Sequence, residues 1–131
     1  MIKDIFLIDD DELVNFLNHE IIKDSYPDKR IRSFENAIEA LETLKGMIDT
    51  PNAEFPQLIF LDINMPIMDG WEFLSEFSQL PKNGIQNCKV VVHTSSIDPR
   101  DSEKAKTFAV VKDFVTKPLT ISSLSKIFES K

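Results

Sequence analysis

Four short polar stretches of this sequence each follow an apolar run: 8–11, 61–66, 92–95 and 114–118. They carry acidic side chains, a threonine and a lysine. The ends of neighbouring strands in a parallel sheet open onto one crevice, where such folds bind ligands. If the apolar runs are strands of one sheet, these groups lie together. Carboxylates, a hydroxyl and an amine in one crevice can hold a cation and a phosphoryl group.

Asp9, Asp10 and Asp62 are the acidic members of this set. At ~5 Å and an effective dielectric constant of ~20, each pair of charges costs about 3 kcal/mol. A divalent cation offsets such repulsion, and Mg²⁺ prefers hard oxygen ligands. The alternative is that the adjacent acids cap a following helix, with Asp10 or Asp11 as the N-cap. We favour capping for Asp11 and Glu12, and leave both interpretations open for Asp9 and Asp10.

Asp62 follows an apolar run and precedes a turn, where a carboxylate can attack phosphorus and form an acyl phosphate. Phosphoryl transfer depends mainly on positioning and electrostatics. Lys117 can supply positive charge and Thr94 a hydroxyl donor to the phosphoryl oxygens. Each residue alone has a simpler explanation, since Lys117 could be a solvated lysine and Thr94 an ordinary strand residue. The joint pattern carries the hypothesis.

Five apolar runs predict the strands that position these residues. They are 5–8, 31–34, 58–61, 90–92 and 111–115. Three of them are continuous rather than alternating, which suits strands covered on both faces of a parallel sheet. Helical patterns lie between the runs. Strand–helix alternation repeated five times predicts an α/β fold, a doubly wound, flavodoxin-like sheet of five parallel strands with helices on both faces.

Apolar residues at helical spacing predict which side of each helix faces the core. The predicted core positions are Leu13, Phe16, Leu17 and Ile21; Ala37, Ile38, Leu41, Leu44 and Ile48; Trp71, Leu74 and Phe77; and Leu119, Leu124, Ile127 and Phe128. The segment 98–108 is more polar and predicts a short, weakly buried helix. The stretches 49–56 and 81–87 are typical of surface loops.

Composition limits the classes of function. A chain of 131 residues suggests one domain, 1–131. The net charge of −7 disfavours binding to nucleic acid or to an anionic membrane. Because there is one cysteine, Cys88, no intramolecular disulfide can form, and we expect Cys88 at the start of a buried strand rather than as a reactive thiol. The run Ile5–Ile8 is too short for a signal peptide or a membrane span, so we expect a soluble, cytoplasmic protein.

The four stretches together resemble the receiver domain of a two-component response regulator, of the stand-alone chemotaxis type. The similarity covers essentially the whole chain. The most diagnostic motif is Leu-Asp-Ile-Asn-Met-Pro-Ile-Met-Asp-Gly at 61–70, followed by Phe-Val-Thr-Lys-Pro-Leu at 114–119. The resemblance implies the following roles: Asp62 as phosphate acceptor; Asp9, Asp10, Asp62 and the Asn64 carbonyl as Mg²⁺ ligands; Thr94, Lys117 and Phe114 as phosphate-binding and switch residues; and Asn64 and Ser96 as residues that tune dephosphorylation. It also implies a cis Lys117–Pro118 bond.

The resemblance further implies how the protein acts. A sensor histidine kinase or a phosphotransfer protein donates the phosphoryl group from phosphohistidine. Thr94 then moves inward, Phe114 fills the vacated space, and the face formed by the helix at 98–108, the fifth strand and the last helix changes. The chain ends without an output domain, so we expect regulation of a downstream protein target by contact, as a monomer or weak homodimer. Enzymatic activity would be limited to self-phosphorylation and autodephosphorylation.

Some residues depart from the family pattern, and three other functions fit the sequence less well. His93 stands where the family usually has an apolar residue, and we favour packing or a hydrogen bond over pH sensing. Val110 and Val111 replace a common Gly-Ala pair, so the preceding turn must differ.

A haloacid-dehalogenase-type phosphohydrolase is disfavoured because Asn64 stands in place of its second Asp. A flavodoxin-like electron carrier is disfavoured by the acidic loop at 9–11. A receiver-like module that is never phosphorylated is disfavoured by the intact acidic set.

Overall fold

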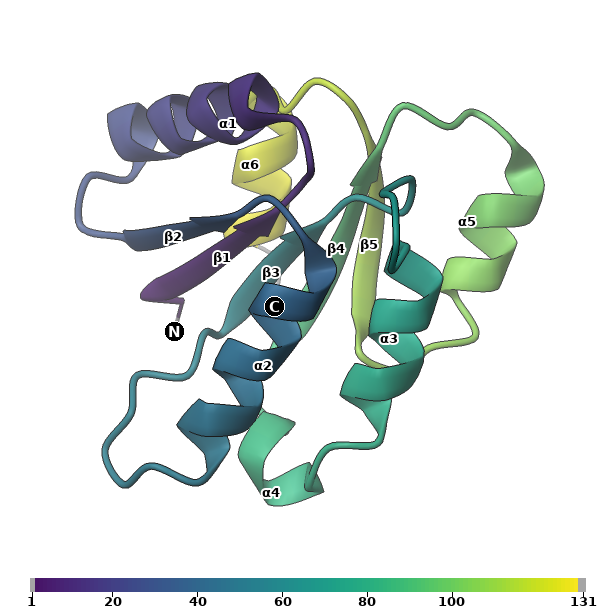
Figure 1. Ribbon diagram of the computed structural model, residues 1–131. Coiled ribbons are helices and arrows are strands. Elements are labelled where there is room, and N and C mark those ends of the chain that lie inside the picture. Colours follow the sequence, from purple (N-terminus) through teal and green to yellow (C-terminus); the bar gives the residue numbers. More distant parts are fainter. Residues whose placement is uncertain (1, 130–131) are drawn as a thin grey trace.

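A computed structural model describes residues 2–129 of the chain as strands and helices that mostly alternate (Figure 1). The strands are β1 (Asp4–Ile8), β2 (Arg30–Phe34), β3 (Leu58–Leu61), β4 (Lys89–Thr94) and β5 (Val111–Thr116). The helices are α1 (Glu12–Ser25), α2 (Ala37–Ile48), α3 (Gly70–Ser78), α4 (Lys82–Ile85), α5 (Pro99–Ala105) and α6 (Ile121–Glu129). None of the described helices is both long enough and apolar enough to cross a membrane.

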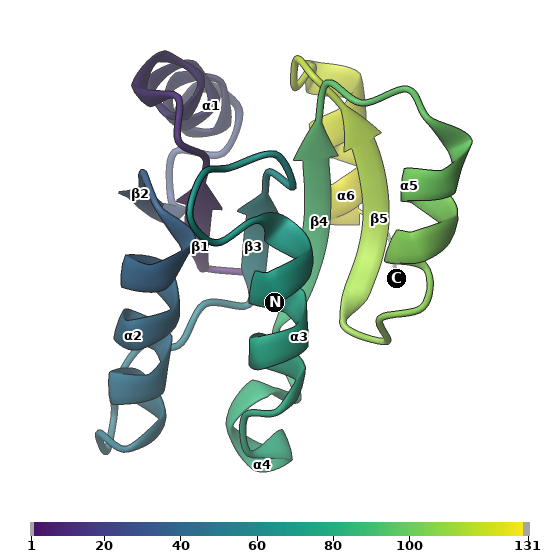
Figure 2. The ribbon, with the colours of Figure 1, turned by 45° about the vertical axis from the view of Figure 1, so that its right-hand side comes forward.

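The five strands form one parallel sheet in the order β2-β1-β3-β4-β5. Every pairing in the sheet is parallel, and the arrows of β1, β3, β4 and β5 in Figure 2 point the same way, so the carboxyl ends of the strands share one edge. The order in which strands join the sheet reverses after β2: β2 lies on one side of β1, and β3 lies on the other side. Strands β1 and β3 are therefore adjacent. This is the switch point at which α/β sheets bind ligands. The predicted fold class is confirmed.

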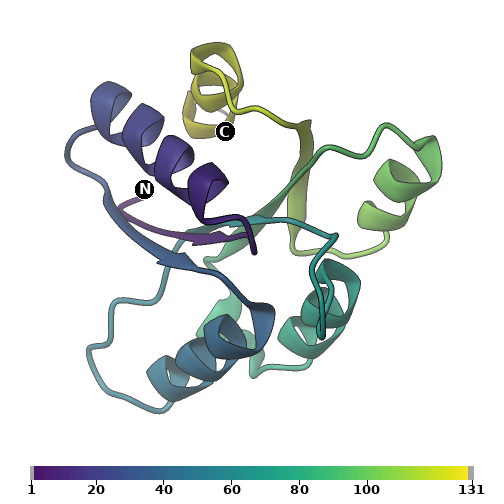
Figure 3. The same cartoon turned by 45° about the horizontal axis from the view of Figure 1, so that its top comes forward.

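The two faces of the sheet pack against different helices, as Figure 3 shows from above. On one face, Phe6 and Ile8 of β1 pack with residues of α2 and α3. On the other, Ile5 and Leu7 pack with residues of α1 and α6. Every residue of β1 and β3 is buried. The continuous apolar runs in the sequence therefore arose from burial on both sides.

The segment 81–87, predicted to be a loop, contains the short helix α4. Its four residues bury no side chain, so no apolar pattern marked it in the sequence. The stretch 49–56 has neither helix nor strand, as predicted. Cys88 lies immediately before β4 rather than inside it and is 1% exposed. Burial raises the pKa of its thiol to about 12, which keeps it protonated and unreactive.

The predicted core face of α1 was wrong. Leu13, Phe16 and Leu17 are exposed at 62%, 58% and 55%. The helix instead buries Asn15, Asn18 and Ile22, while Ile21 is partly buried. On this side Ile22 packs in the core, and the Asn15 amide donates to the Asp9 and Phe34 carbonyls at the ends of β1 and β2. Satisfying these groups took precedence over burying the apolar residues.

The other helices follow their predicted patterns more closely. Leu41 and Leu44 of α2 are buried, as are Leu74 and Phe77 of α3. Ile38, Ile48, Trp71 and Phe128 lie nearer the surface than predicted. The polar segment 98–108 forms α5, whose one buried residue is Ala105. These helices fix the loops that carry the polar stretches.

Candidate functional site

The carboxyl ends of β1, β3 and β5 bring Asp9, Asp62 and Lys117 together. The Lys117 Nζ atom lies 2.7 Å from Asp9 Oδ2 and 3.5 Å from Asp62 Oδ2. Asp9 and Asp62 are 3% and 5% exposed. Three charged groups from distant parts of the sequence thus share one nearly buried site, as the sequence predicted.

Asp62 is held by the backbone of the central strands and by the loop that follows it. Its N–H donates to the Ile8 carbonyl at 3.0 Å, and its Oδ1 accepts from the Asn64 N–H at 3.2 Å. A Cβ on Gly70 would lie 2.7 Å from the Asp62 carbonyl oxygen and 2.6 Å from Ile63 Cα. Only glycine therefore lets the first turn of α3 approach Asp62 this closely.

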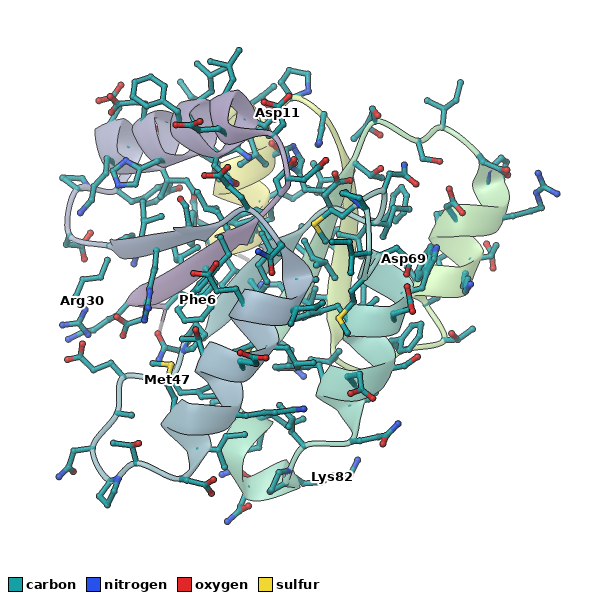
Figure 4. All side chains as sticks on the ribbon, in the orientation of Figure 1. Phe6, Asp11, Arg30, Met47, Asp69 and Lys82 are labelled. Atoms are coloured by element: carbon teal, nitrogen blue, oxygen red, sulfur yellow. The ribbon has the colours of Figure 1, made fainter. Side chains whose placement is uncertain are left out.

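The loop after β1 presents Asp9 inward and Asp10 outward. The Asp11 N–H donates to Asp9 Oδ1 at 2.9 Å, while Asp11 Oδ1 caps α1 by accepting from the Leu13 N–H. Capping by Asp11 is thus confirmed. Figure 4 labels Asp11 and Asp69 at the starts of α1 and α3, the helices that follow β1 and β3.

The three acids form a compact set of oxygen ligands. Asp9, Asp10 and Asp62 each offer one carboxylate oxygen, and these atoms lie within 4.8 Å of one another. Such a set suits a hard divalent cation, which prefers carboxylate oxygens. Asp10 is exposed, which leaves one side of the set open to water and ligand. The residues present therefore fit a Mg²⁺ or Mn²⁺ ion that keeps some coordinated water.

Burial and the neighbouring charges shift the protonation equilibria of the cluster. Burial raises the pKa of Asp62, and the charge of Asp9 adds to this increase, while Lys117 opposes it. Burial lowers the pKa of Lys117, but its hydrogen bond to Asp9 and the charge of Asp62 outweigh that effect, and the net pKa is raised. Lys117 therefore stays cationic, whereas further positive charge nearby would stabilise the ionised form of Asp62.

Thr94 closes the site from the end of β4. Its side chain is fully buried, and its carbonyl accepts from the Lys117 N–H at 2.8 Å. The Thr94 hydroxyl oxygen accepts from the Ser96 N–H at 3.2 Å. Ser96 in turn donates its hydroxyl to Asp101 at 2.5 Å. The threonine is therefore connected through Ser96 to the first turn of α5.

The remaining predicted residues lie around this centre. Asn64 is exposed two residues beyond Asp62, and its N–H donates to the Asp62 carboxylate. Phe114 in β5 is partly buried against the core on the α5 side. The Lys117–Pro118 bond is cis. The Val110 carbonyl accepts from the Val90 N–H at the turn before β5, and no glycine is needed there.

His93 is buried next to Thr94 and faces α1. Its Nδ1 lies 3.5 Å from the Asn18 side-chain nitrogen, and its ring makes an edge contact with Phe60. Burial lowers the pKa of His93 to about 4, and the charge of Lys117 contributes to the decrease. The imidazole is therefore neutral near pH 7, in agreement with a packing role.

The sequence did not identify three residues that shape the site. Asn15 contacts the loop containing Asp9, and Asp101 binds Ser96. Ile67 adopts φ 69°, a left-handed conformation that is unfavourable for a β-branched residue, and its side chain is 86% exposed. Asn15 lay on the side of its helix that the apolar pattern predicted to face solvent, so nothing in the sequence signalled its role. Asp101 and Ile67 were not marked by any pattern either.

A comparison with protein families identifies this arrangement. Residues 5–129 match the family described as "Response regulator receiver domain". The chain belongs to this receiver family. Receiver domains are the phosphorylatable parts of two-component response regulators, and they act as regulatory switches rather than classical enzymes.

Individual relatives agree with this assignment. The receiver is 30% identical to response regulator Rcp1 of Synechocystis sp. over 127 residues, covering 97% of this chain and 84% of Rcp1. It is 29% identical to chemotaxis protein CheY of Halobacterium salinarum over 118 residues, covering 90% of this chain and 87% of CheY.

Solved structures share its fold. A two-component response regulator from Cytophaga hutchinsonii has a TM-score of 0.88 and 35% identity, covering 98% of this receiver and 95% of that chain. The phosphorylated cyanobacterial phytochrome response regulator RcpA has a TM-score of 0.80 and 27% identity, with coverage of 99% and 96%. The Mn²⁺-bound form of Rcp1 has a TM-score of 0.75 and 30% identity, with coverage of 95% and 88%.

Proposed function

We propose that this receiver accepts a phosphoryl group on Asp62 from the phosphohistidine of a sensor histidine kinase or phosphotransfer protein. The supporting observation is the placement of Asp62, which is nearly buried, contacted by Lys117 and flanked by two further acids. A carboxylate in such a site is shielded from bulk water, and its nucleophilic oxygen faces groups that can neutralise the incoming phosphoryl charge.

In the transfer step, an Asp62 oxygen forms a bond to phosphorus as the N–P bond of phosphohistidine breaks. The electron pair of that bond returns to the imidazole, which leaves as neutral histidine after taking up a proton. Lys117, freed in part from Asp9, pairs with a phosphoryl oxygen as a fixed positive charge. Thr94 donates its hydroxyl to another phosphoryl oxygen. Each residue thus compensates charge that develops in the transition state.

Asp9, Asp10, Asp62 and the Asn64 carbonyl would hold Mg²⁺. When bound, the ion supplies charge neutralisation for the phosphoryl oxygens. The close oxygens of the three acids and the raised pKa of Asp62 support a cation at this position. The receiver itself orients Asp9 through the Asp11 N–H and Asp62 through the Asn64 N–H.

The switch begins with Thr94. Its hydroxyl oxygen accepts from the Ser96 N–H and keeps its own hydrogen for donation to a phosphoryl oxygen, so movement of the side chain toward Asp62 would lengthen the contact with Ser96. The loop before α5 then loses one restraint, and Phe114, which is only partly buried, moves into the space next to Thr94. The surface formed by α5, β5 and α6 changes and regulates a protein partner. Asn64 and Ser96, near the path of attacking water, tune the lifetime of the acyl phosphate.

The rim of the site supports a protein as phosphodonor. Exposed apolar side chains lie on α1, on the loops after β3 and β4, and at the first residue of α6. They are Leu13, Phe16, Leu17, Ile67, Ile97 and Ile121. Exposed apolar side chains that gather near a reactive centre are typical of a protein-binding surface. A small-molecule phosphatase substrate would not require it.

We further propose that the chain, 1–131, works as a single receiver domain in the cytoplasm, as a monomer or weak homodimer. The net charge of −7 argues against partners with dense negative charge, such as nucleic acid or an anionic membrane. The same charge favours a partner with a basic or apolar surface.

Acetyl phosphate with Mg²⁺, followed by intact-mass measurement, tests the proposal. We expect one phosphate on the wild-type protein and none on Asp62→Asn, because the amide cannot form the acyl phosphate. Chelation of Mg²⁺ should abolish the reaction. Phosphate that persists on Asp62→Asn would refute the assignment of the acceptor. Rapid turnover of varied phosphate monoesters would instead support a phosphohydrolase, and copurified flavin an electron carrier.

A further inference from the structure

Helix α1 turns its polar side toward the sheet. Asn15 and Asn18 are 4% and 6% exposed, although apolar residues were available on the opposite side of the helix. Asparagine has a low helix propensity, and a buried amide is favourable only when it is hydrogen-bonded. The orientation of α1 therefore depends on what these two amides bind.

Asn15 joins the ends of two strands. Its Nδ2 atom donates to the Asp9 carbonyl at 2.9 Å and to the Phe34 carbonyl at 3.2 Å. The same Phe34 carbonyl accepts from the Asp9 N–H at 3.1 Å. The Asp9 N–H is therefore bonded to the end of β2, and the Asp9 carbonyl is bonded to Asn15. Both bonds lie where β1 ends and the acidic loop begins.

The Asp9 carboxylate is held separately, by the Asp11 N–H and by Lys117. These contacts orient the side chain, but they do not determine where the residue sits relative to Asp62. Asp9 lies just past the last residue of β1, outside the regular pairing of the sheet. The Asn15 bonds therefore hold the backbone in place one residue beyond β1, at Asp9 itself.

The arrangement has an energetic cost that packing alone does not explain. Asn15 Oδ1 is buried and has no hydrogen-bond partner among the described residues. An unsatisfied buried acceptor is destabilising, and an aliphatic residue at this position would not introduce one. The amide is therefore better explained by its two donated bonds than by its contribution to the core.

We propose that Asn15 is a positioning residue for the cation site, which acts by fixing the backbone of Asp9. This inference rests on the proposed function, because it assumes that Asp9 is a ligand. Residues that orient metal ligands from outside the coordination shell change metal affinity by ~10–100-fold when replaced. Loss of Asn15 should therefore weaken Mg²⁺ binding and leave the chemistry at saturating Mg²⁺ nearly unchanged.

The experiment compares Asn15→Leu with Asn18→Leu by calorimetric titration with Mg²⁺ and by phosphorylation with acetyl phosphate at increasing Mg²⁺. Asn18 is the matched control, because it is buried on the same side of α1 and contacts His93 rather than the acidic loop. We expect the dissociation constant for Mg²⁺ to rise at least about tenfold in Asn15→Leu and to stay within about twofold in Asn18→Leu. The phosphorylation rate at saturating Mg²⁺ should be close to wild type in both.

Asn15→Ser provides a second measurement if Asn15→Leu folds poorly. Its hydroxyl can donate to one of the two carbonyls, so we expect a Mg²⁺ affinity between those of wild type and Asn15→Leu. Equal Mg²⁺ affinity in wild type and both Asn15 variants would overturn this inference alone. An equal loss of Mg²⁺ affinity in Asn18→Leu would overturn it too, because the effect would then come from a general loosening of α1. A wild-type protein that binds no Mg²⁺ would overturn the proposed cation site itself.

Discussion

Helices α1 and α2 begin in the same way but pack on opposite principles. Each starts after a strand and has an Asx N-cap, Asp11 for α1 and Asn36 for α2. Helix α2 buries an apolar stripe that includes Leu41 and Leu44, whereas α1 buries two asparagines and exposes its leucines. The difference teaches that apolar periodicity identifies the buried side of a helix only when the neighbouring strand ends need no donors from it.

The largest expected effect tests the packing difference directly. Leu44→Ala in α2 should lower the free energy of unfolding by about 2–5 kcal/mol, because the side chain is fully buried. Leu17→Ala in α1 should change it by less than about 0.5 kcal/mol, since that side chain is 55% exposed. Urea denaturation of both variants measures the contrast. A large loss in Leu17→Ala would contradict the orientation of α1.

The buried histidine beneath α1 should make stability sensitive to acid. The pKa of His93 is about 4 in the folded state and near 6.5 when unfolded, so the unfolded chain binds the extra proton first. Stability should therefore fall as the pH falls from 6.5 to 4, by on the order of 3 kcal/mol.

Thermal unfolding across this pH range, compared between wild type and His93→Gln, checks the acid effect. The variant should lose much of the dependence on pH, because glutamine does not titrate. His19→Gln, on the outer part of α1, is the control and should keep the wild-type acid sensitivity. An unchanged pH profile in His93→Gln would rule out His93 as its source.

The exposed side of α1 should matter for the phosphodonor and not for the fold. Phe16→Ala should slow phosphotransfer from a protein donor about tenfold, the effect of losing roughly 1.4 kcal/mol of contact energy. Phosphorylation by acetyl phosphate should be unaffected, because that donor makes no contact with the helix surface. Ile38→Ala, exposed at 37% at the start of α2, is the control. Equal rates for Phe16→Ala and wild type with a protein donor would argue against docking on α1.

The smallest effects should come from the features that the two helices share. Asp11→Ala and Asn36→Ala each remove a side chain that accepts a backbone N–H in the first turn. Each should cost about 1 kcal/mol of stability. Chemical denaturation should give similar values for the two variants. A much larger cost for Asp11→Ala would argue against an equal capping role for the two residues, because the backbone N–H that Asp11 donates to Asp9 survives the substitution.

The sequence predicted the sheet and the site because both depend on burial and strand order. The continuous apolar runs of β1 and β3 reflect burial on two faces, and the residues that follow them must share one edge of the sheet. Asp9, Asp62 and Lys117 met there as predicted. The roles assigned to them remain predictions until phosphorylation and metal binding are measured.

Other features depended on contacts that no local pattern reveals. The side of α1 that faces inward is set by carbonyl groups of Asp9 and Phe34, which lie far from Asn15 in sequence or outside its helix. Helix α4 buries nothing and so left no apolar signal. The positive φ of Ile67 depends on the path of the loop after β3, and isoleucine is a residue for which this conformation is not expected.

The protected state of Cys88 makes the wild-type chain suitable for site-specific spectroscopy. Maleimide reagents require an accessible thiolate, which this buried thiol does not offer in the native protein. A cysteine introduced at the exposed Ile97 would therefore take up a single fluorophore without any background replacement. Such a label would report rearrangement of the segment between β4 and α5 in real time.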